Sequence, residues 1–311
     1  MSSGSTEAYT VSQPIGVPVR SQIVTRLADY LELTKPRIAV MALVTVSVGY
    51  LLGSAGVWRG TPFAHAMFGI ALVAAGSSIF NQLMERTTDS RMERTADRPL
   101  PSGRITPYEA MALGLLCSAA GTVWLLINVN LLTAILGLAT LLLYVGVYTP
   151  LKQRSSLCTA IGAVPGALPP VLGWTAAGGT LDWSAFSLFA LLFLWQFPHF
   201  LAIAWIYRDD YSRAGLKMLP ESEGGVRLVG GFAVAYALAL LPVSLLPSEL
   251  ALAGTGYAMA AVVLGAGYLV CAVLFARNET TKTARRLLLS SLIYLPTLLL
   301  ILCWDHVQLL N

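Results

Sequence analysis

The segment from Asn81 to Arg104 carries dense charge directly after an apolar run. It holds four of the sixteen acidic residues and five of the twenty lysines and arginines, although residues 60–84 are uncharged. If the helix of that run continues past Met84, one face presents a polar side chain at every fourth position: Asn81, Glu85, Asp89, Glu93 and Asp97. Mg²⁺ is usually held by one or two carboxylates together with substrate phosphates. The spacing therefore predicts a metal–diphosphate site at a membrane surface.

The same segment has a simpler interpretation as a solvated helix. Mixed-charge runs are usually solvent faces, and neighbouring arginines would neutralise the carboxylates here. Asn81 favours a site instead, because it lies within the apolar run, where an amide is unfavourable unless it has a partner or a function.

The composition excludes a soluble domain. The chain is 56% hydrophobic and 12% charged, whereas soluble domains are about 25% charged. A membrane-spanning helix needs about 20 apolar residues, and one of the uncharged runs, 110–151, is long enough for two. We therefore predict an all-α bundle of nine transmembrane helices over 23–311, after a disordered tail at 1–22. The uncharged runs are 38–58, 60–84, 110–151, 155–181, 183–207, 228–248, 250–276 and 287–304.

The basic residues are distributed by topology. With nine spans, nineteen of the twenty lysines and arginines fall on one side of the membrane, and only Arg59 falls on the other. The positive-inside rule makes the first side the cytoplasm. We expect a bacterial plasma-membrane protein with its N-terminus inside and its C-terminus outside; a mitochondrial inner-membrane protein is the less favoured alternative. No basic patch indicates a nucleic-acid partner.

A second set of carboxylates ends the sixth predicted span. Asp209 and Asp210 occupy the position there that Glu85 and Asp89 occupy in the second span, which predicts two acidic clusters facing each other across a cavity. The proline-rich segment 99–104 cannot be helical and is expected to fold back over the first cluster. The glycines and prolines of the fifth span predict a helix packed closely in the bundle interior.

Three further residues have open roles. Lys152 follows a long uncharged run, so it is either a membrane-surface anchor or a charge for a phosphate oxygen. Lys35, beyond a predicted interfacial helix at 23–33, poses the same choice. His199 lies within a span, where hydrogen-bonded packing and a functional role are equally reasonable.

The ordered set of these motifs resembles the intramembrane prenyltransferase superfamily, and within it the branch whose acceptor is haem. The resemblance covers 34–220 in motifs and the whole chain in span count. It rests on the sequences LTKPR at 33–37, NQLMERTTD at 81–89, MERT at 92–95, RPLPSGR at 98–104, YTPLK at 148–152, PHF at 198–200 and DY at 210–211 with AGLKMLP at 214–220.

The resemblance implies nine helices around a central cavity with cytoplasmic loop caps. It implies Mg²⁺-dependent transfer of a farnesyl group from farnesyl diphosphate to a vinyl group of haem b, giving haem O for terminal oxidases. By position, Asn81, Glu85 and Asp89 would form the first metal motif, and Asp209 and Asp210 the second, with Glu85, Asp89 and Asp210 as the metal ligands.

Two features depart from the superfamily pattern. Glu85 stands where aspartate is usual, and Asp209 and Asp210 are adjacent rather than four residues apart. Neighbours on a helix do not face the same way, so one of the two aspartates is expected to act indirectly.

The remaining implied roles concern the substrate. Tyr148 and Lys152 match the superfamily's pair near the diphosphate, and Arg94, Arg98 and Lys152 would neutralise the leaving group. An apolar cavity would hold the prenyl chain, and His199 would approach the haem. Four aromatic residues are candidates to surround that cavity, although facing the lipid is an equally reasonable position for them: Trp195, Phe197, Phe200 and Trp205.

Two alternatives stay open. One is a prenyltransferase for another aromatic or tetrapyrrole acceptor. The other is a secondary transporter, which would require ionisable residues near mid-membrane and inverted repeats around the site; only His199 meets the first requirement.

Overall fold

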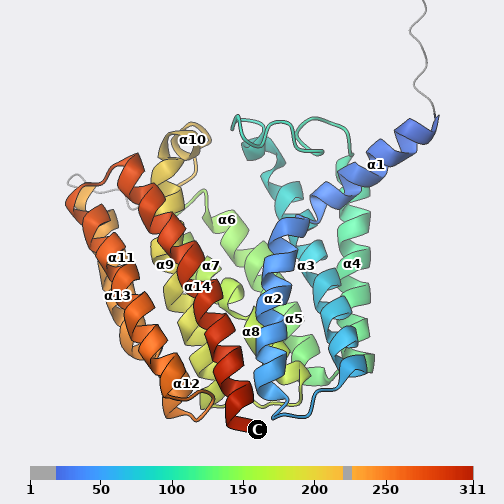
Figure 1. The fold of residues 1–311 in the computed structure, drawn as a ribbon. Helices are drawn as coiled ribbons and strands as arrows, with labels where there is room; N and C mark the ends of the chain where they lie inside the picture. Colours follow the sequence, from blue (N-terminus) through green and yellow to red (C-terminus); the bar gives the residue numbers. More distant parts are fainter. Residues whose placement is uncertain (1–18, 220–225, 311) are drawn as a thin grey trace, which may run out of the picture.

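Figure 1 shows long helices lying side by side, joined by connections at both ends of the bundle. The structure is a computed structural model and describes residues 19–219 and 226–310. Over these residues the chain is helical and forms no β-strand, as the charge-free runs predict. The part of the predicted tail at 1–18 lies outside the described residues, whereas 19–22 already belong to helix α1 (Val19–Leu33).

Eight helical stretches in the described part of the chain are long and apolar enough to cross a membrane, so this is a multi-pass membrane protein. Most are single helices, but the fourth stretch combines three elements and the sixth two. In chain order they are α2 (Pro36–Gly53), α3 (Gly60–Asp89), α4 (Pro107–Asn128), Leu131–Leu151 with α5 (Leu131–Leu142), η1 (Leu143–Tyr148) and α6 (Thr149–Leu151), α9 (Trp183–Ile206), Leu228–Glu249 within α11 (Val226–Val243) and α12 (Leu246–Glu249), α13 (Thr255–Arg277) and α14 (Thr281–Leu310).

The remaining predicted crossing, residues 155–181, consists of two shorter helices. α7 (Cys158–Ala167) ends where α8 (Pro169–Ala176) begins, with Leu168 between them. Proline has no backbone N–H to continue the hydrogen-bond ladder and is tolerated in the first turn of a helix. The consecutive prolines Pro169 and Pro170 therefore break the fifth crossing in two, and the nine predicted crossings correspond to the eight stretches above and this pair of shorter helices.

α8 lies in the interior of the bundle, as the density of glycine and proline predicts. All of its residues from Pro170 to Ala176 are buried. It packs against α2 at backbone-contact distance: a Cβ added to Gly49 would lie 1.8 Å from the carbonyl oxygen of Pro170, and one added to Gly173 would lie 1.9 Å from that of Val46. Small residues allow such close approach in membrane proteins.

The connections after α3 and α9 lie at the same end of the bundle as α1 and α10 (Arg208–Arg213), as Figure 1 shows. We call this the cap end. The segment after α3 folds back there as predicted: two of its own side chains, Met92 and Leu100, are buried, and Thr95 Oγ1 donates to the backbone oxygen of Asp89 at 2.8 Å. It is tied to α1 by Arg104 Nε, which lies 2.8 Å from Asp29 Oδ1.

One expectation for this segment is wrong. α3 ends at Asp89, and the backbone then forms a series of turns, so Glu93 and Asp97 do not continue the acidic helical face. Both residues are exposed. The turn is stabilised by the Thr95 contact with the last helical carbonyl, a tertiary contact that four-residue spacing does not reveal.

Candidate active site

The three predicted oxygen-bearing side chains do share one face of α3 and line one cavity. Asn81, Glu85 and Asp89 are 0%, 9% and 1% exposed, respectively. Buried carboxylates are unfavourable unless a cation or a hydrogen-bond donor satisfies them. The end of α3 therefore holds two acids in a place where they need a partner.

Cations from two other segments supply these partners. Lys152 Nζ donates to Glu85 Oε1 at 2.7 Å, and Arg98 Nη1 donates to Asp89 Oδ2 at 2.7 Å. Burial disfavours the Lys152 ammonium, but the electrostatic attraction of Tyr148 and Glu85 outweighs it and raises the pKa of Lys152 well above its ordinary value. Two roles were open for Lys152, a membrane-surface anchor and a charge for a phosphate oxygen. Its position inside the cavity favours the second role.

Lys35 also reaches this cavity. Its backbone is left-handed, with φ 50° and ψ 60°, at the start of α2. Its Nζ donates to Asn81 Oδ1 at 2.6 Å. Burial, together with the nearby charges of Lys152 and Arg98, lowers the pKa of Lys35 to about 8. The side chain is therefore charged at neutral pH and would gain from a bound anion.

These side chains line what we call the polar cavity, with a volume of about 120 Å³. It is walled by the start of α2, the end of α3, the cap segment after α3, η1, the residue after α6, and α10 with the residues that follow it. Its lining residues are Lys35, Asn81, Glu85, Asp89, Met92, Arg94, Arg98, Tyr144, Tyr148, Lys152, Tyr211, Leu216 and Met218.

Two tyrosines enter the polar cavity from η1, which is a π-helix. Tyr144 and Tyr148 pack with ring centroids 5.2 Å apart, and Lys152 Nζ lies 4.5 Å from the centre of the Tyr148 ring. π-Helical turns are rare and often occur at functional sites. The sequence predicts a kinked end at Pro150 and a role for Tyr148, but it gave no reason to single out Tyr144.

Arg94, also predicted, contributes to the rim of the polar cavity. The side chain is exposed, and its guanidinium lies 5.3 Å from the centre of the Tyr207 ring. This contact joins the cap segment after α3 to the end of α9. Arg94 is therefore placed where it can meet a ligand without first leaving a buried ion pair.

The second predicted acidic cluster does not join the first. The Asp209 side chain is 79% exposed and lies 3.8 Å from Arg208, and that of Asp210 is 21% exposed and pairs with Arg213. Neither lines the polar cavity, although Tyr211 does. Across the described ranges 19–219 and 226–310, no three His, Cys, Asp or Glu side chains form a group that could hold a metal ion. Asp210 as a metal ligand stays a prediction.

His199 lies on α9 outside the polar cavity. Its Nδ1 is 2.8 Å from Ser291 Oγ on α14, and its ring stacks on Trp195 with centroids 5.1 Å apart. The hydrogen bond and the stacking together fix the orientation of the imidazole. The next residue, Phe200, lines a second cavity.

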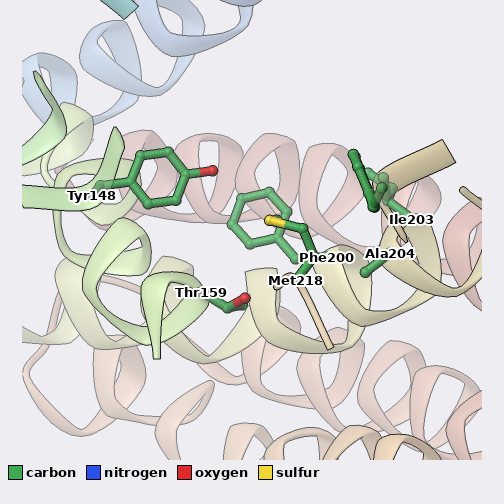
Figure 2. Close-up of a pocket in the computed structure, with 7 residues that line it drawn as sticks. Tyr148, Thr159, Phe200, Ile203, Ala204 and Met218 are labelled. Carbon is green, nitrogen blue, oxygen red and sulfur yellow. The ribbon is translucent and has the colours of Figure 1, made fainter. Parts of the chain in front are cut away.

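This second cavity, the apolar cavity, has a volume of about 160 Å³. In Figure 2, Tyr148 from η1 and Phe200 from α9 extend toward each other across it. It shares Tyr148, Tyr211 and Met218 with the polar cavity, so the two are adjacent. Its lining residues are Tyr148, Thr159, Phe200, Ile203, Ala204, Tyr211 and Met218.

Of the four aromatic residues predicted around such a cavity, only Phe200 lines it. Phe197 is buried against Tyr236, with ring centroids 3.8 Å apart, and Trp205 is buried next to Phe275. Trp195 donates from Nε1 to the backbone oxygen of Ser291. These three aromatics pack helix against helix, which α9 does on most of its faces.

The polar cavity brings oxygen donors and cations together at one end of a membrane helix bundle. This arrangement defines a class of membrane enzymes that use prenyl diphosphates. The model of the UbiA prenyltransferase family matches residues 42–295, and the chain belongs to this family. Two relatives named protoheme IX farnesyltransferase are each 44% identical to it. That of Koribacter versatilis (strain Ellin345) matches over 309 residues, 96% of this chain and 99% of the relative, and that of Solibacter usitatus (strain Ellin6076) over 279 residues, 87% and 96%.

Solved structures share the fold at low sequence identity. A structure of digeranylgeranylglyceryl phosphate synthase has a TM-score of 0.78 at 19% identity and covers 91% of this chain and 99% of that one. A UbiA homologue from Archaeoglobus fulgidus bound to GPP and Mg²⁺ has a TM-score of 0.59 at 16% identity, covering 88% and 99%. At these identities the likeness establishes the fold.

Proposed function

We propose that this chain transfers the farnesyl group of farnesyl diphosphate to a vinyl group of haem b, giving haem O and diphosphate. The names of its relatives support this reaction, because they match nearly the whole chain at 44% identity. The observation that carries the proposal is the polar cavity, where the oxygen donors of α3 face several cations at one end of a membrane bundle. We expect the product to be used by terminal oxidases.

The donor set of the polar cavity fits Mg²⁺. Glu85 and Asp89 offer hard carboxylate oxygens, and Asn81 offers an amide oxygen toward the same cavity. Mg²⁺ commonly takes one or two carboxylates and completes its shell with water and substrate phosphates, so a third nearby acid is not required. When bound, the metal would stabilise negative charge on the diphosphate. Asp210 is proposed as a further ligand.

The cations of the cavity would serve the leaving group. Lys35, Arg98 and Lys152 now pair with the donors of α3, and the diphosphate offers them stronger anionic partners. Together with Arg94 at the rim, they would stabilise the charge that develops as the carbon–oxygen bond breaks.

The reaction balances without a redox partner. The bond between farnesyl C1 and the diphosphate oxygen breaks, and its electron pair leaves with the diphosphate. The vinyl π electrons form the new carbon–carbon bond to C1. Water adds to the other vinyl carbon and releases a proton. The protein must therefore stabilise an allylic cation while keeping water away from C1.

The apolar cavity is suited to the hydrocarbon part of the substrates. Phe200 and Tyr148 present aromatic faces, which attract cationic carbon, and Ile203 and Met218 exclude water. Because this cavity adjoins the polar one, a diphosphate in the first would place its prenyl chain in the second.

His199 is proposed as a haem contact. Its Nδ1 is engaged by Ser291, and a hydrogen bond of this kind orients the imidazole for a ligand at the other ring nitrogen. Its neighbour Phe200 faces the apolar cavity. Retention of haem affinity in His199→Ala would argue against iron ligation.

The test is direct turnover by purified protein. Haem b and isotope-labelled farnesyl diphosphate are incubated with the protein in lipid nanodiscs, with Mg²⁺ or with EDTA, and the products are identified by mass. We expect haem O only with Mg²⁺. Labelled product from another aromatic or tetrapyrrole acceptor, with none from haem b, would assign a different acceptor.

Two pairs of variants locate the reaction. Glu85→Gln and Asp89→Asn should each lower kcat at least a hundredfold, because they weaken the donor set. Glu93→Gln and Asp97→Asn are the matched controls, since both side chains are exposed and off the helical face, and they should keep kcat within twofold. Equal effects in both pairs would remove the polar cavity from the mechanism.

A further inference from the structure

We propose that Thr149 is a positioning residue: its hydroxyl holds the side-chain amide of Asn81 so that Oδ1 faces the polar cavity. This inference rests on the proposed function, because it concerns the oxygen that Asn81 offers to a metal–diphosphate complex. Thr149 does not line the cavity and is 3% exposed. It acts on the ligand only through Asn81.

The contacts around the Asn81 amide are specific on both sides. Asn81 Nδ2 donates to Thr149 Oγ1 at 3.1 Å, and Asn81 Oδ1 accepts from Lys35 Nζ at 2.6 Å. Since Asn81 is fully buried, water does not offer its amide other partners. The orientation of the amide therefore depends on these two neighbours.

The hydroxyl of Thr149 determines where the NH₂ group of the Asn81 amide points. Its single proton is used in a hydrogen bond to the backbone oxygen of Tyr144, at 2.8 Å. With that proton engaged, Oγ1 can only accept a hydrogen bond, so the amide must turn its NH₂ group toward it. On the other side, the Lys35 ammonium has donors only and must face the amide oxygen.

The π-helical turn provides the carbonyl, that of Tyr144, which accepts the hydroxyl proton of Thr149. Thr149 follows η1 directly, and its backbone N–H also bonds to the oxygen of Tyr144. The same carbonyl thus anchors both the backbone and the side chain of Thr149. η1 therefore carries Tyr144 and Tyr148 into the polar cavity and fixes the hydroxyl that orients Asn81.

A reversed amide would impair the site. It would present NH₂ toward the cavity, where Lys35 offers no acceptor and a hard cation requires oxygen. Thr149→Val keeps the shape of the side chain but removes the hydroxyl. We therefore expect the affinity for a metal–diphosphate complex to fall about tenfold, the equivalent of one hydrogen bond.

The experiment measures binding directly, without turnover. Mn²⁺ replaces Mg²⁺, inorganic pyrophosphate is the ligand, and free Mn²⁺ is followed by electron paramagnetic resonance during titration of the purified protein. Thr149→Val should bind about tenfold more weakly than wild type, whereas Thr149→Ser, which keeps the hydroxyl, should stay within twofold. Thr149→Ala, which also lacks the hydroxyl, is the second variant should Thr149→Val fail to fold.

A control variant and a second background separate positioning from general damage. Thr133→Val removes another buried hydroxyl, bonded to Thr175 Oγ1 at 2.9 Å and away from the cavity, and should leave binding unchanged. In an Asn81→Asp background the two oxygens are equivalent and need no orientation. Adding Thr149→Val there should change the affinity less than twofold.

Two results would overturn the inference alone: unchanged binding in Thr149→Val, or an equal loss in the Asn81→Asp background. Wild-type protein that binds no Mn²⁺ with pyrophosphate would overturn both the inference and the proposed metal site.

Discussion

Lys35 and Arg37 are two residues apart at the start of α2, yet their surroundings differ. The left-handed backbone at Lys35 accompanies a side chain that lines the polar cavity and bonds Asn81, whereas Arg37 is exposed. A lysine at the membrane surface is usually an anchor. Here the geometry favours a direct role for Lys35 and leaves anchoring to Arg37.

Lys35→Met should therefore weaken substrate binding. The substitution removes a charge-assisted interaction worth about 1.5–3 kcal/mol, so the KM for farnesyl diphosphate is expected to rise at least tenfold. Arg37→Met is the matched control and should change KM less than twofold. Steady-state kinetics at saturating haem b measure both. Similar effects of the two substitutions would return Lys35 to the role of an anchor.

The residues that could be predicted are those whose signal is local. Asn81, Glu85 and Asp89 repeat along one helix, so their shared face follows from helical geometry. Tyr144 and Thr149 could not be identified in this way, because their roles depend on a π-turn. That turn changes which face each residue presents, and four-residue spacing does not encode it.

α10 is the element whose position departs most from expectation. The sequence predicts that its aspartates face those of α3, but Asp210 pairs with Arg213 outside the polar cavity. Tyr211, which lies between the two paired residues, and Leu216, which follows them, do line the cavity. Because its neighbour Tyr211 already lines the cavity, we expect Asp210 to reach a bound ligand if this short helix rotates.

Asp210→Asn tests that movement. If Asp210 joins the site when substrate binds, the substitution should lower kcat at least tenfold, whereas Asp209→Asn, at a more exposed neighbour, should have less than a twofold effect. Single-turnover measurements would separate chemistry from product release. Wild-type kinetics in Asp210→Asn would remove it from the metal ligands and leave the end of α3 as the sole acidic motif.

The contact between α2 and α8 shows that the sequence can indicate a buried helix without indicating which helix it packs against. The prolines and glycines of the fifth crossing indicate an interior helix, but they do not identify its neighbour. The neighbour is set by Gly49, which meets the backbone of Pro170 directly. Where two backbones touch, an added methyl group meets backbone atoms, which cannot move aside as a flexible side chain can.

Gly49→Ala should consequently destabilise the protein strongly. The new Cβ would lie 1.8 Å from a carbonyl oxygen, so the helices must separate, and overpacking of this kind costs about 1–3 kcal/mol or more. Gly267→Ala on α13 is the matched control, because nothing lies within 4 Å of the added atom. Alanine is the better helix former by roughly 1 kcal/mol, so this control should be neutral or stabilising. The thermal midpoint of the detergent-solubilised protein measures both.

For the molecule as a whole, the crossings could be predicted because charge is excluded from hydrocarbon and leaves uncharged runs that are easily recognised. The packing of the crossings could not, since apolar side chains that face lipid and those that face protein are the same types. Val263 and Leu300 are exposed, for example, whereas Leu298 is buried. The broken fifth crossing shows that a run of suitable length need not be one helix.

We propose the orientation in the membrane from the same distribution of charge. The polar cavity lies among the connections that carry most of the basic residues, so the positive-inside rule predicts that it is at the cytoplasmic face. A cysteine introduced at exposed Glu93 should therefore react with a membrane-impermeant maleimide only after the cells are broken. One at exposed Thr180, between α8 and α9 at the opposite end, should react in intact cells. The four native cysteines are replaced by alanine in both variants. The polar cavity and Glu93 lie at the same end of the bundle, so both must be on the same side of the membrane. Labelling of Glu93→Cys in intact cells would therefore place the diphosphate site outside the cell and contradict the predicted orientation.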